Sequence, residues 1–275
     1  MLLNPPVLPR TMARLILGDR HDIAGKTVLL TGASSGVGRA TAHALGRDGA
    51  RLILVARTAE PLLGVRDAVR AEGGLAESIT CDLSDPDDTD RLAATVLDRY
   101  GTVEVLVNNA GRSIRRRATE ATDRFHDYER TMALNYFGAA RLTMGLLPAM
   151  LDAGDGHIVN VATWGVAAGS MPKFTAYHAS KAALAAFGRS LGAETRARGV
   201  HVTTVGFPLV RTEMIAPTGA YDEAAALSAE RAAEWIGIAL RTRPVELYPR
   251  YTRILQILAT VSPRAVDAAV WRLGI

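Results

Sequence analysis

The chain has 275 residues, of which 48% are hydrophobic and 22% are charged. This length allows one or two domains with a sizeable core, and it excludes a disordered chain and a small disulfide-stapled scaffold. The 32 Lys+Arg and 28 Asp+Glu residues leave a net charge of +4, too small an excess to indicate nucleic-acid binding. The single cysteine, Cys81, excludes an internal disulfide and a cysteine-cluster metal site, and it fits a reducing cytoplasm. We therefore expect a cytoplasmic protein without a metal, a signal peptide or a membrane-spanning segment.

From Lys26 onward, short apolar runs alternate with longer helical stretches. The apolar runs cover residues 28–30, 52–55, 103–107, 158–161 and 200–205, with a weaker strand at 76–81. Between them, apolar residues are spaced as in helices over 39–47, 60–71, 89–100, 131–151 and 176–198. Nearly continuous apolar strands separated by helices predict an α/β fold, a doubly wound parallel sheet of the Rossmann type.

The chain reads as a single domain, because no linker or shift in composition divides it. We predict an N-terminal extension over residues 1–25 and a Rossmann-type domain over 26–275. Within that domain, residues 207–275 are expected to form a substrate-facing lobe with C-terminal helices.

A glycine-rich turn, TGASSGVG, follows the first apolar run and opens the first helix. Gly32 permits a tight turn, Gly36 lets the backbone approach a pyrophosphate, and Gly38 lets the helix pack closely on the strand. The start of the helix offers unpaired N–H groups and a positive dipole end to the phosphates. The turn predicts a dinucleotide site with contacts from Gly32, Ser34, Ser35, Gly36, Val37 and Gly38.

Two residues at the ends of the next strands concern the choice of cofactor. Arg57 stands where an NAD-binding protein usually carries a carboxylate for the ribose 2′-hydroxyl, and a guanidinium there pairs with a 2′-phosphate instead. We therefore predict NADP(H), the alternative being that Arg57 is a solvated charge. Asp82 either accepts a hydrogen bond from the adenine amino group or caps the following helix. Cys81, beside it, is expected to be a small buried residue rather than a nucleophile.

Tyr177 and Lys181 are four residues apart in a helical pattern, so they share one face of the helix. An ammonium in that position favours the tyrosinate and brings the phenol closer to a working acid or base. Almost all basic residues of the chain are arginines, so a lysine at this position indicates a need for a compact ammonium group. The alternative is an ordinary surface Tyr–Lys pair.

Three ordered motifs, TGASSGVG, the NNAG run at 108–111 and YxxxK, resemble the short-chain dehydrogenase/reductase family over about residues 25–215. The resemblance implies that NNAG stabilises the central sheet and lies along the cofactor. It also implies a catalytic Asn135, whose carbonyl holds a relay water for Lys181, and a substrate-orienting hydroxyl after the fifth strand. Thr163 takes that position, with Ser170 as a weaker rival. The cofactor contacts expected in addition to the glycine turn, Arg57 and Asp82 are Asn109, Ala110, Gly111, Tyr177, Lys181, Val210 and Thr212.

The predicted reaction is reduction of a carbonyl by hydride from NADPH. Tyr177 gives a proton to the oxygen, and Thr163 stabilises the developing negative charge. The stretches 108–116, 123–137 and 208–218 resemble bacterial long-chain fatty acyl-CoA reductases and their actinobacterial relatives, which implies a fatty acyl-CoA or fatty aldehyde as substrate. The alternatives are a ketoreductase acting on a β-ketoacyl, steroid-like or secondary-metabolite ketone, and a non-catalytic NADP-binding interaction protein.

Two further segments concern partners. The cluster Arg112, Arg115, Arg116 and Arg117 either binds the phosphates of coenzyme A or forms a solvated loop. Residues 251–275 have helically spaced apolar side chains that would cover an acyl chain, lie on a membrane surface, or pack on the core or another subunit. The family implies a homo-oligomer, a dimer or tetramer. We expect a small-molecule or acyl-chain substrate, peripheral membrane contact as an option, and no nucleic-acid partner.

Overall fold

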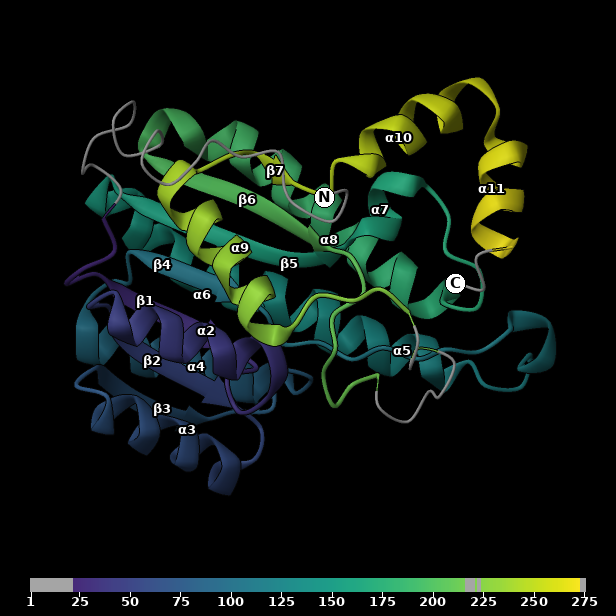
Figure 1. Ribbon diagram of the computed structural model, residues 1–275. Helices are drawn as coiled ribbons and strands as arrows, with labels where there is room; N and C mark the ends of the chain where they lie inside the picture. The colour runs from purple at the N-terminus through teal and green to yellow at the C-terminus, as the bar shows by residue number, and fades with distance from the viewer. Residues whose placement is uncertain (1–21, 216–220, 222–223, 273–275) are drawn as a thin grey trace.

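A computed structural model describes residues 22–215, 221 and 224–272. Its seven parallel strands form one sheet in the order β3-β2-β1-β4-β5-β6-β7. This arrangement confirms the doubly wound Rossmann-type sheet, with the strand order reversing between β1 and β4 (Figure 1). The strands are β1 (Thr27–Thr31), β2 (Arg51–Ala56), β3 (Leu75–Thr80), β4 (Val105–Asn108), β5 (Gly156–Thr163), β6 (Val200–Phe207) and β7 (Glu246–Leu247).

Helices cover both faces of the sheet, and alternate residues of each strand point to opposite faces. In β1, Val28 and Leu30 pack in the core beneath α2 (Gly36–Arg47), α3 (Ala59–Ala71) and α9 (Ala229–Thr242). Leu29, between them, packs on the other side with α4 (Pro86–Tyr100), α6 (Ala139–Ala153) and α8 (Thr175–Thr195). Both faces are buried, which explains why the strands read as unbroken apolar runs.

The observed helices extend the predicted ones in the middle of the chain. The stretch expected from residue 131 begins earlier, as α5 (His126–Met132), and continues through a π-helical segment, η3 (Ala133–Gly138), into α6. β4 starts at Val105, two residues later than predicted, although Val103 is itself buried. The short elements η2 (Ala118–Glu120), α7 (Trp164–Ala168) and η4 (Arg196–Arg198) had no clear periodicity, because they are about one turn long.

The two ends of the chain differ in how far the structure describes them. Of the extension predicted over residues 1–25, positions 1–21 lie outside the described residues, and Ile23 is already buried in the core. Within residues 207–275, α9 packs beside α2 and belongs to the helical layer of the sheet. The helices α10 (Tyr251–Val261) and α11 (Pro263–Arg272) follow, and α10 packs on α7. Among the described residues, no helix combines the length and apolar character needed to cross a bilayer.

Candidate active site

A cleft of about 1080 Å³ lies at the carboxyl ends of the strands, where the fold places ligands. Nearly all of the predicted site residues line it, from the glycine turn through Tyr177 and Lys181 to Val210 and Thr212. Asn135 is the exception, since it is fully buried behind the wall of the cleft. The structure therefore brings residues from seven separate segments of the chain to one place.

The glycine turn has the shape of a phosphate cradle. Gly32 and Gly36 have φ angles of +65° and +49°, in the left-handed region that favours glycine. A Cβ on Gly32 would lie 2.8 Å from the Cα of Ala110, and one on Gly38 would clash with the carbonyl oxygen of Gly32. The side chain of Ser35 makes no capping hydrogen bond to α2, so the first N–H groups of that helix remain available to a ligand. This bare helix start fits a dinucleotide pyrophosphate.

The NNAG run ties β4 to β1, as the resemblance implied. The amide nitrogens of Asn109 and Ala110 both donate to Thr31 Oγ1, at 3.0 Å. Asn109 Nδ2 donates to the carbonyl oxygens of Thr31 and Gly32 at 2.9 and 3.2 Å, which fixes the floor of the glycine turn. A Cβ on Gly111 would lie 3.2 Å from Lys181 Nζ, so this glycine gives the lysine room.

Arg57 and Asp82 lie near each other where the loops after β2 and β3 line the cleft, with Arg112 close to both. We call this the adenosine end, because it is where the fold is expected to place the adenosine of a dinucleotide. Burial opposes ionisation of Asp82, but hydrogen bonds from Ser84 and the charges of Arg57 and Arg112 lower its pKa overall. Burial, Arg130 and Arg57 lower the pKa of Arg112. Two guanidinium groups therefore lie near one carboxylate here, and this local excess of positive charge suits a phosphate-bearing ribose. Sequence reasoning missed the position of Arg112, because nothing in its spacing indicated the direction of its side chain.

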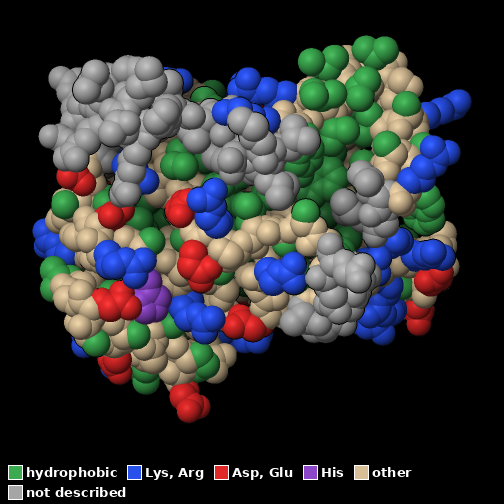
Figure 2. All heavy atoms as spheres, in the orientation of Figure 1, with side chains coloured by type: hydrophobic (Ala, Val, Ile, Leu, Met, Phe, Trp, Pro, Cys, Tyr) green, Lys and Arg blue, Asp and Glu red, His purple; other side chains and the backbone are tan. Residues whose placement is uncertain are grey.

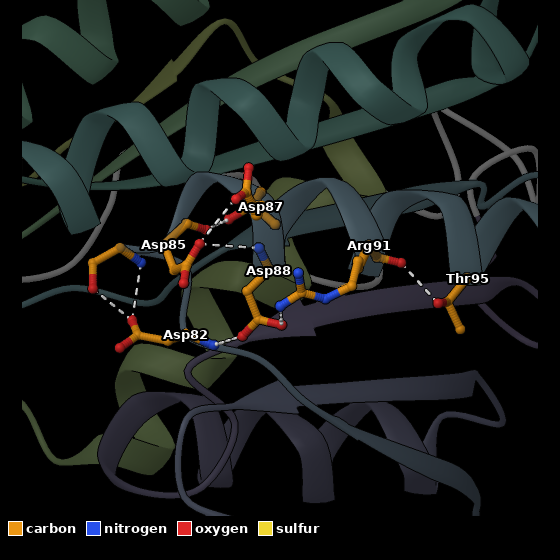
Figure 3. A network of polar contacts seen from close by, with 8 residues as sticks. Asp82, Asp85, Asp87, Asp88, Arg91 and Thr95 are labelled. Atoms are coloured by element: carbon orange, nitrogen blue, oxygen red, sulfur yellow. Dashed lines mark hydrogen bonds and ion pairs between the residues drawn. The ribbon is translucent and has the colours of Figure 1, made fainter.

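The helix-cap alternative for Asp82 is wrong, as Figure 3 shows. The carboxylate of Asp85 caps α4 by accepting from the N–H groups of Asp87 and Asp88 at 2.9 and 3.2 Å. The carboxylate of Asp82 instead accepts from the N–H and the hydroxyl of Ser84 at 3.0 and 2.6 Å. These bonds form a turn that precedes the cap residue Asp85. Cys81 is buried as expected, and burial together with Asp88 raises the pKa of its thiol to about 12.

Tyr177 and Thr163 both line the cleft, and the hydroxyl of Thr163 lies close enough to that of Tyr177 to lower its pKa. Thr163 is the last residue of β5, and Tyr177 lies in the first turn of α8. Thr163 lines the cleft, whereas Ser170, the other candidate for the substrate-orienting hydroxyl, is not among the residues that line it. Lys181 follows one turn after Tyr177, and its Nζ donates to the carbonyl oxygen of Val161 at 2.8 Å.

The expected lowering of the pKa of Tyr177 by Lys181 is wrong. Burial raises the pKa of Tyr177 to about 12, and the group that lowers it is the hydroxyl of Thr163. The ammonium of Lys181 is itself desolvated, which lowers its pKa to about 8, and it is directed at a backbone carbonyl. The residue spacing gave the correct face of the helix but not the partner of the ammonium.

Asn135 is held rigidly within the π-helical segment η3, an interruption typical of functional sites. Its Oδ1 accepts from the N–H of Arg112 at 2.8 Å, and its Nδ2 donates to the carbonyl of Arg112 and to Ser180 Oγ, both at 2.9 Å. Ser180 Oγ in turn donates to the carbonyl oxygen of Tyr177 at 2.7 Å. Sequence reasoning missed Ser180, although its place between Tyr177 and Lys181 was a usable signal.

Beyond Tyr177, the cleft has an apolar wall and a basic rim. We define the apolar wall as the lining side chains Trp164, Met171, Phe174, Met214, Ile215, Tyr251, Ile254 and Leu255. The basic rim consists of Arg115 and Lys173, which line the cleft, and Arg117 next to them. Lys173 Nζ and Arg117 Cζ each lie 5.6 Å from the ring centroid of Trp271, and Arg115 Cζ lies 5.6 Å from that of Tyr221.

The predicted arginine cluster therefore divides into separate groups. Arg112 faces the adenosine end, and Arg116 forms an ion pair with Asp127 at 3.7 Å. Arg117 pairs with Glu120 at 2.9 Å and does not itself line the cleft. Arg115 is the member that lines the substrate side of the cleft, and Lys173 joins it from another segment.

This combination of a Rossmann-type sheet, a glycine cradle and an Asn-Thr-Tyr-Lys set defines a nucleotide-dependent oxidoreductase. The family model described as short chain dehydrogenase matches residues 26–222. The chain belongs to this family of short-chain dehydrogenases, and it is an oxidoreductase of that class.

Two curated relatives are similar over most of their length. A protein of Mycobacterium tuberculosis named fatty acyl-CoA reductase is 47% identical, covering 98% of this chain and 92% of the relative. A fatty acyl-CoA reductase of Acinetobacter baylyi is 45% identical, covering 89% of this chain and 82% of the relative. Among solved structures, a metagenomic short-chain oxidoreductase in complex with NADP has a TM-score of 0.70 at 31% identity, covering 82% of this chain and 93% of that one.

Proposed function

We propose that the protein reduces a fatty acyl-CoA thioester to the fatty aldehyde with NADPH as the hydride donor. The observation that carries the proposal is the cleft itself, which offers an apolar wall and a basic rim on the substrate side of Tyr177. A fatty acyl-CoA has the same division, because its thioester joins an alkyl chain to a phosphate-bearing carrier. The relatives named fatty acyl-CoA reductase support the same substrate class.

NADP(H) is the cofactor that the cleft suits. The glycine cradle and the start of α2 would hold the pyrophosphate, and Arg57 with Arg112 would bind a 2′-phosphate. The solved relative in complex with NADP supports this choice. When bound, NADPH supplies the hydride for the reaction.

The residues around the carbonyl would supply the proton and the electrostatic stabilisation. A raised pKa keeps Tyr177 protonated at neutral pH, which is the form needed to donate to the carbonyl oxygen as the carbon is reduced. The hydroxyl of Thr163 donates to the same oxygen and stabilises its developing charge. Addition of the hydride to the carbon and of the proton to the oxygen gives a hemithioacetal. As its C–S bond breaks, the C=O bond re-forms and the hydroxyl proton passes to sulfur, so coenzyme A leaves as the thiol and the aldehyde remains. Lys181 contacts the carbonyl of Val161, and Asn135 contacts Ser180, so both fix the position of α8 behind Tyr177. They would also supply the path by which Tyr177 is reprotonated.

The test is a substrate panel followed by NADPH absorbance and aldehyde analysis. Palmitoyl-CoA should be reduced to hexadecanal, and a C16 ketone should be a poor substrate. Reduction of ketones with no turnover of palmitoyl-CoA would replace the proposal with the ketoreductase alternative. If no compound in the panel caused NADPH oxidation, the result would favour the alternative of a non-catalytic NADP-binding protein.

Replacing Arg115 by alanine should raise the KM for palmitoyl-CoA about tenfold, because a charge-assisted contact to phosphate is lost. The KM for the N-acetylcysteamine thioester of palmitate should not change, since this substrate has the same reacting bond and no phosphate. Arg198, an exposed arginine far along the chain, provides the matched control as Arg198→Ala. Equal effects on both thioesters would mean that Arg115 does not bind the phosphates of coenzyme A.

Replacing Arg57 by alanine should lower the preference for NADPH over NADH by about 10- to 100-fold, the amount expected for one charged hydrogen bond to phosphate. The measurement is kcat/KM for each cofactor with one fixed substrate. Arg47→Ala is the control, because Arg47 is exposed at the end of α2, pairs with Glu72 and does not line the cleft. An unchanged preference would mean that Arg57 is only a charge at the end of β2.

The cytoplasmic location and the assembly into a dimer or tetramer stay predictions, as do the individual roles of the residues in the cleft.

A further inference from the structure

Helix α10 presents an apolar stripe to the outside of the molecule. Its side chains Ile254, Ile257, Leu258 and Val261 are 61%, 66%, 47% and 79% exposed. Their spacing of three, one and three residues places them on one helical face, while Tyr251 and Leu255, which border this face, pack against Trp164 of α7 and against α11. Figure 2 shows the resulting cluster of hydrophobic side chains at the position of α10. A concentrated patch of this kind marks a contact surface.

The charges of the segment that contains α10 and α11 are almost all positive. Residues 250–272 contain four arginines, Arg250, Arg253, Arg264 and Arg272, all exposed, and one acidic residue, Asp267. An amphipathic helix with arginines next to an apolar face is the arrangement that binds an anionic membrane surface. The apolar side chains enter the acyl region while the arginines stay with the phosphates.

The stripe also adjoins the cleft. Ile254 belongs both to the exposed stripe and to the apolar wall, together with Tyr251 and Leu255 of the same helix. Apolar surface therefore runs from the outside of α10 into the space beside Tyr177. A molecule with a long alkyl chain would pass along it without crossing water.

We propose that α10 docks on the surface of an anionic phospholipid bilayer, so that the cleft opens toward the lipid. This docking is an interaction of the protein with the membrane surface, and it holds for any lipid-derived substrate of the cleft. A second copy of the chain fits the stripe less well. A two-fold contact would place the arginines of one α10 against those of the other, where residues 250–261 supply no carboxylate.

The experiment is co-sedimentation of the full chain with vesicles of phosphatidylcholine that contain 0 or about 30% phosphatidylglycerol, at low and high salt. Binding should be strongest with the anionic vesicles and should weaken as salt rises. The double variant Ile257→Asp/Val261→Asp should lower the bound fraction at least about tenfold, because both side chains would enter the bilayer. Neither residue lines the cleft, so turnover of a short-chain, water-soluble substrate should not change.

The matched control is Leu63→Asp, which places the same change on an exposed apolar residue of α3. It should bind vesicles like the unmodified chain. Absence of vesicle binding, or equal binding by the double variant, would overturn the proposal. A change from dimer to monomer in the double variant without vesicle binding would overturn it as well, and would assign the stripe to a second copy. Because the readout is vesicle binding, it is independent of whether palmitoyl-CoA is the substrate.

Discussion

Replacing Tyr177 by phenylalanine should lower kcat for carbonyl reduction by about 10²- to 10⁴-fold, the range expected when a general acid is removed. The phenol is the titratable group that lines the cleft beside Thr163, and its pKa of about 12 keeps it in the donating form at neutral pH. The ring would stay in place, because phenylalanine keeps its contact with Phe174, whose centroid lies 6.1 Å away. The affinity for NADPH, measured by fluorescence titration, should change little.

Tyr136→Phe is the control for the loss of a phenol. Tyr136 lies next to Asn135 in η3 and packs against Phe137 and Phe187 rather than in the cleft. Its replacement should leave kcat within a few-fold of the unmodified protein. Retention of full activity by Tyr177→Phe would remove the acid role of this residue, and with it the oxidoreductase mechanism proposed for this cleft.

The fold could be predicted because its signals are local and repeated. Leu29 and its neighbours in β1 are buried on both faces, so the strand is apolar throughout, and the helices between strands have their own period. The glycine turn and the Tyr177–Lys181 pair were also readable, since their geometry depends on a few adjacent residues. These features account for the doubly wound sheet and for most of the cleft.

The directions of long side chains could not be predicted in this way. Arg112 and Arg115 are three residues apart, yet one lies near Asp82 at the adenosine end and the other lies on the rim beside Lys173. Lys181 points to the carbonyl of Val161, a contact between α8 and β5 that exists only in the folded chain. These directions are set by tertiary contacts that leave no periodic trace in the sequence.

The same limit applies to α10. Its helical period was visible, but the period alone does not tell which face is buried. Packing of Tyr251 and Leu255 on Trp164 decides this, and leaves Ile257 and Val261 outside. The outcome is an amphipathic helix with its more apolar face exposed, which only the structure could reveal.

Replacing Thr163 by valine should lower kcat by about 10²- to 10³-fold, the amount expected for losing one hydrogen-bond donor to a developing oxyanion. Valine has nearly the same shape, so β5 and its neighbours should pack as before. The hydroxyl of Tyr177 would lose its partner within the cleft, and the lost bond should cost about 1–3 kcal/mol of stability, measurable by denaturant unfolding.

Thr163→Ser separates the hydroxyl from the methyl group. Serine keeps the donor and the hydrogen bond to Tyr177 but frees χ1, so kcat should stay within about fivefold of the unmodified protein. The pair of variants therefore assigns the effect to one atom, Oγ1, since both keep the length of the side chain nearly constant. Full activity of the valine variant would mean that the hydroxyl has no part in the reaction, and a loss in the serine variant alone would mean that the methyl group shapes the cleft. Loss in valine alone, with NADPH affinity retained, would place the hydroxyl of Thr163 on the carbonyl oxygen beside Tyr177.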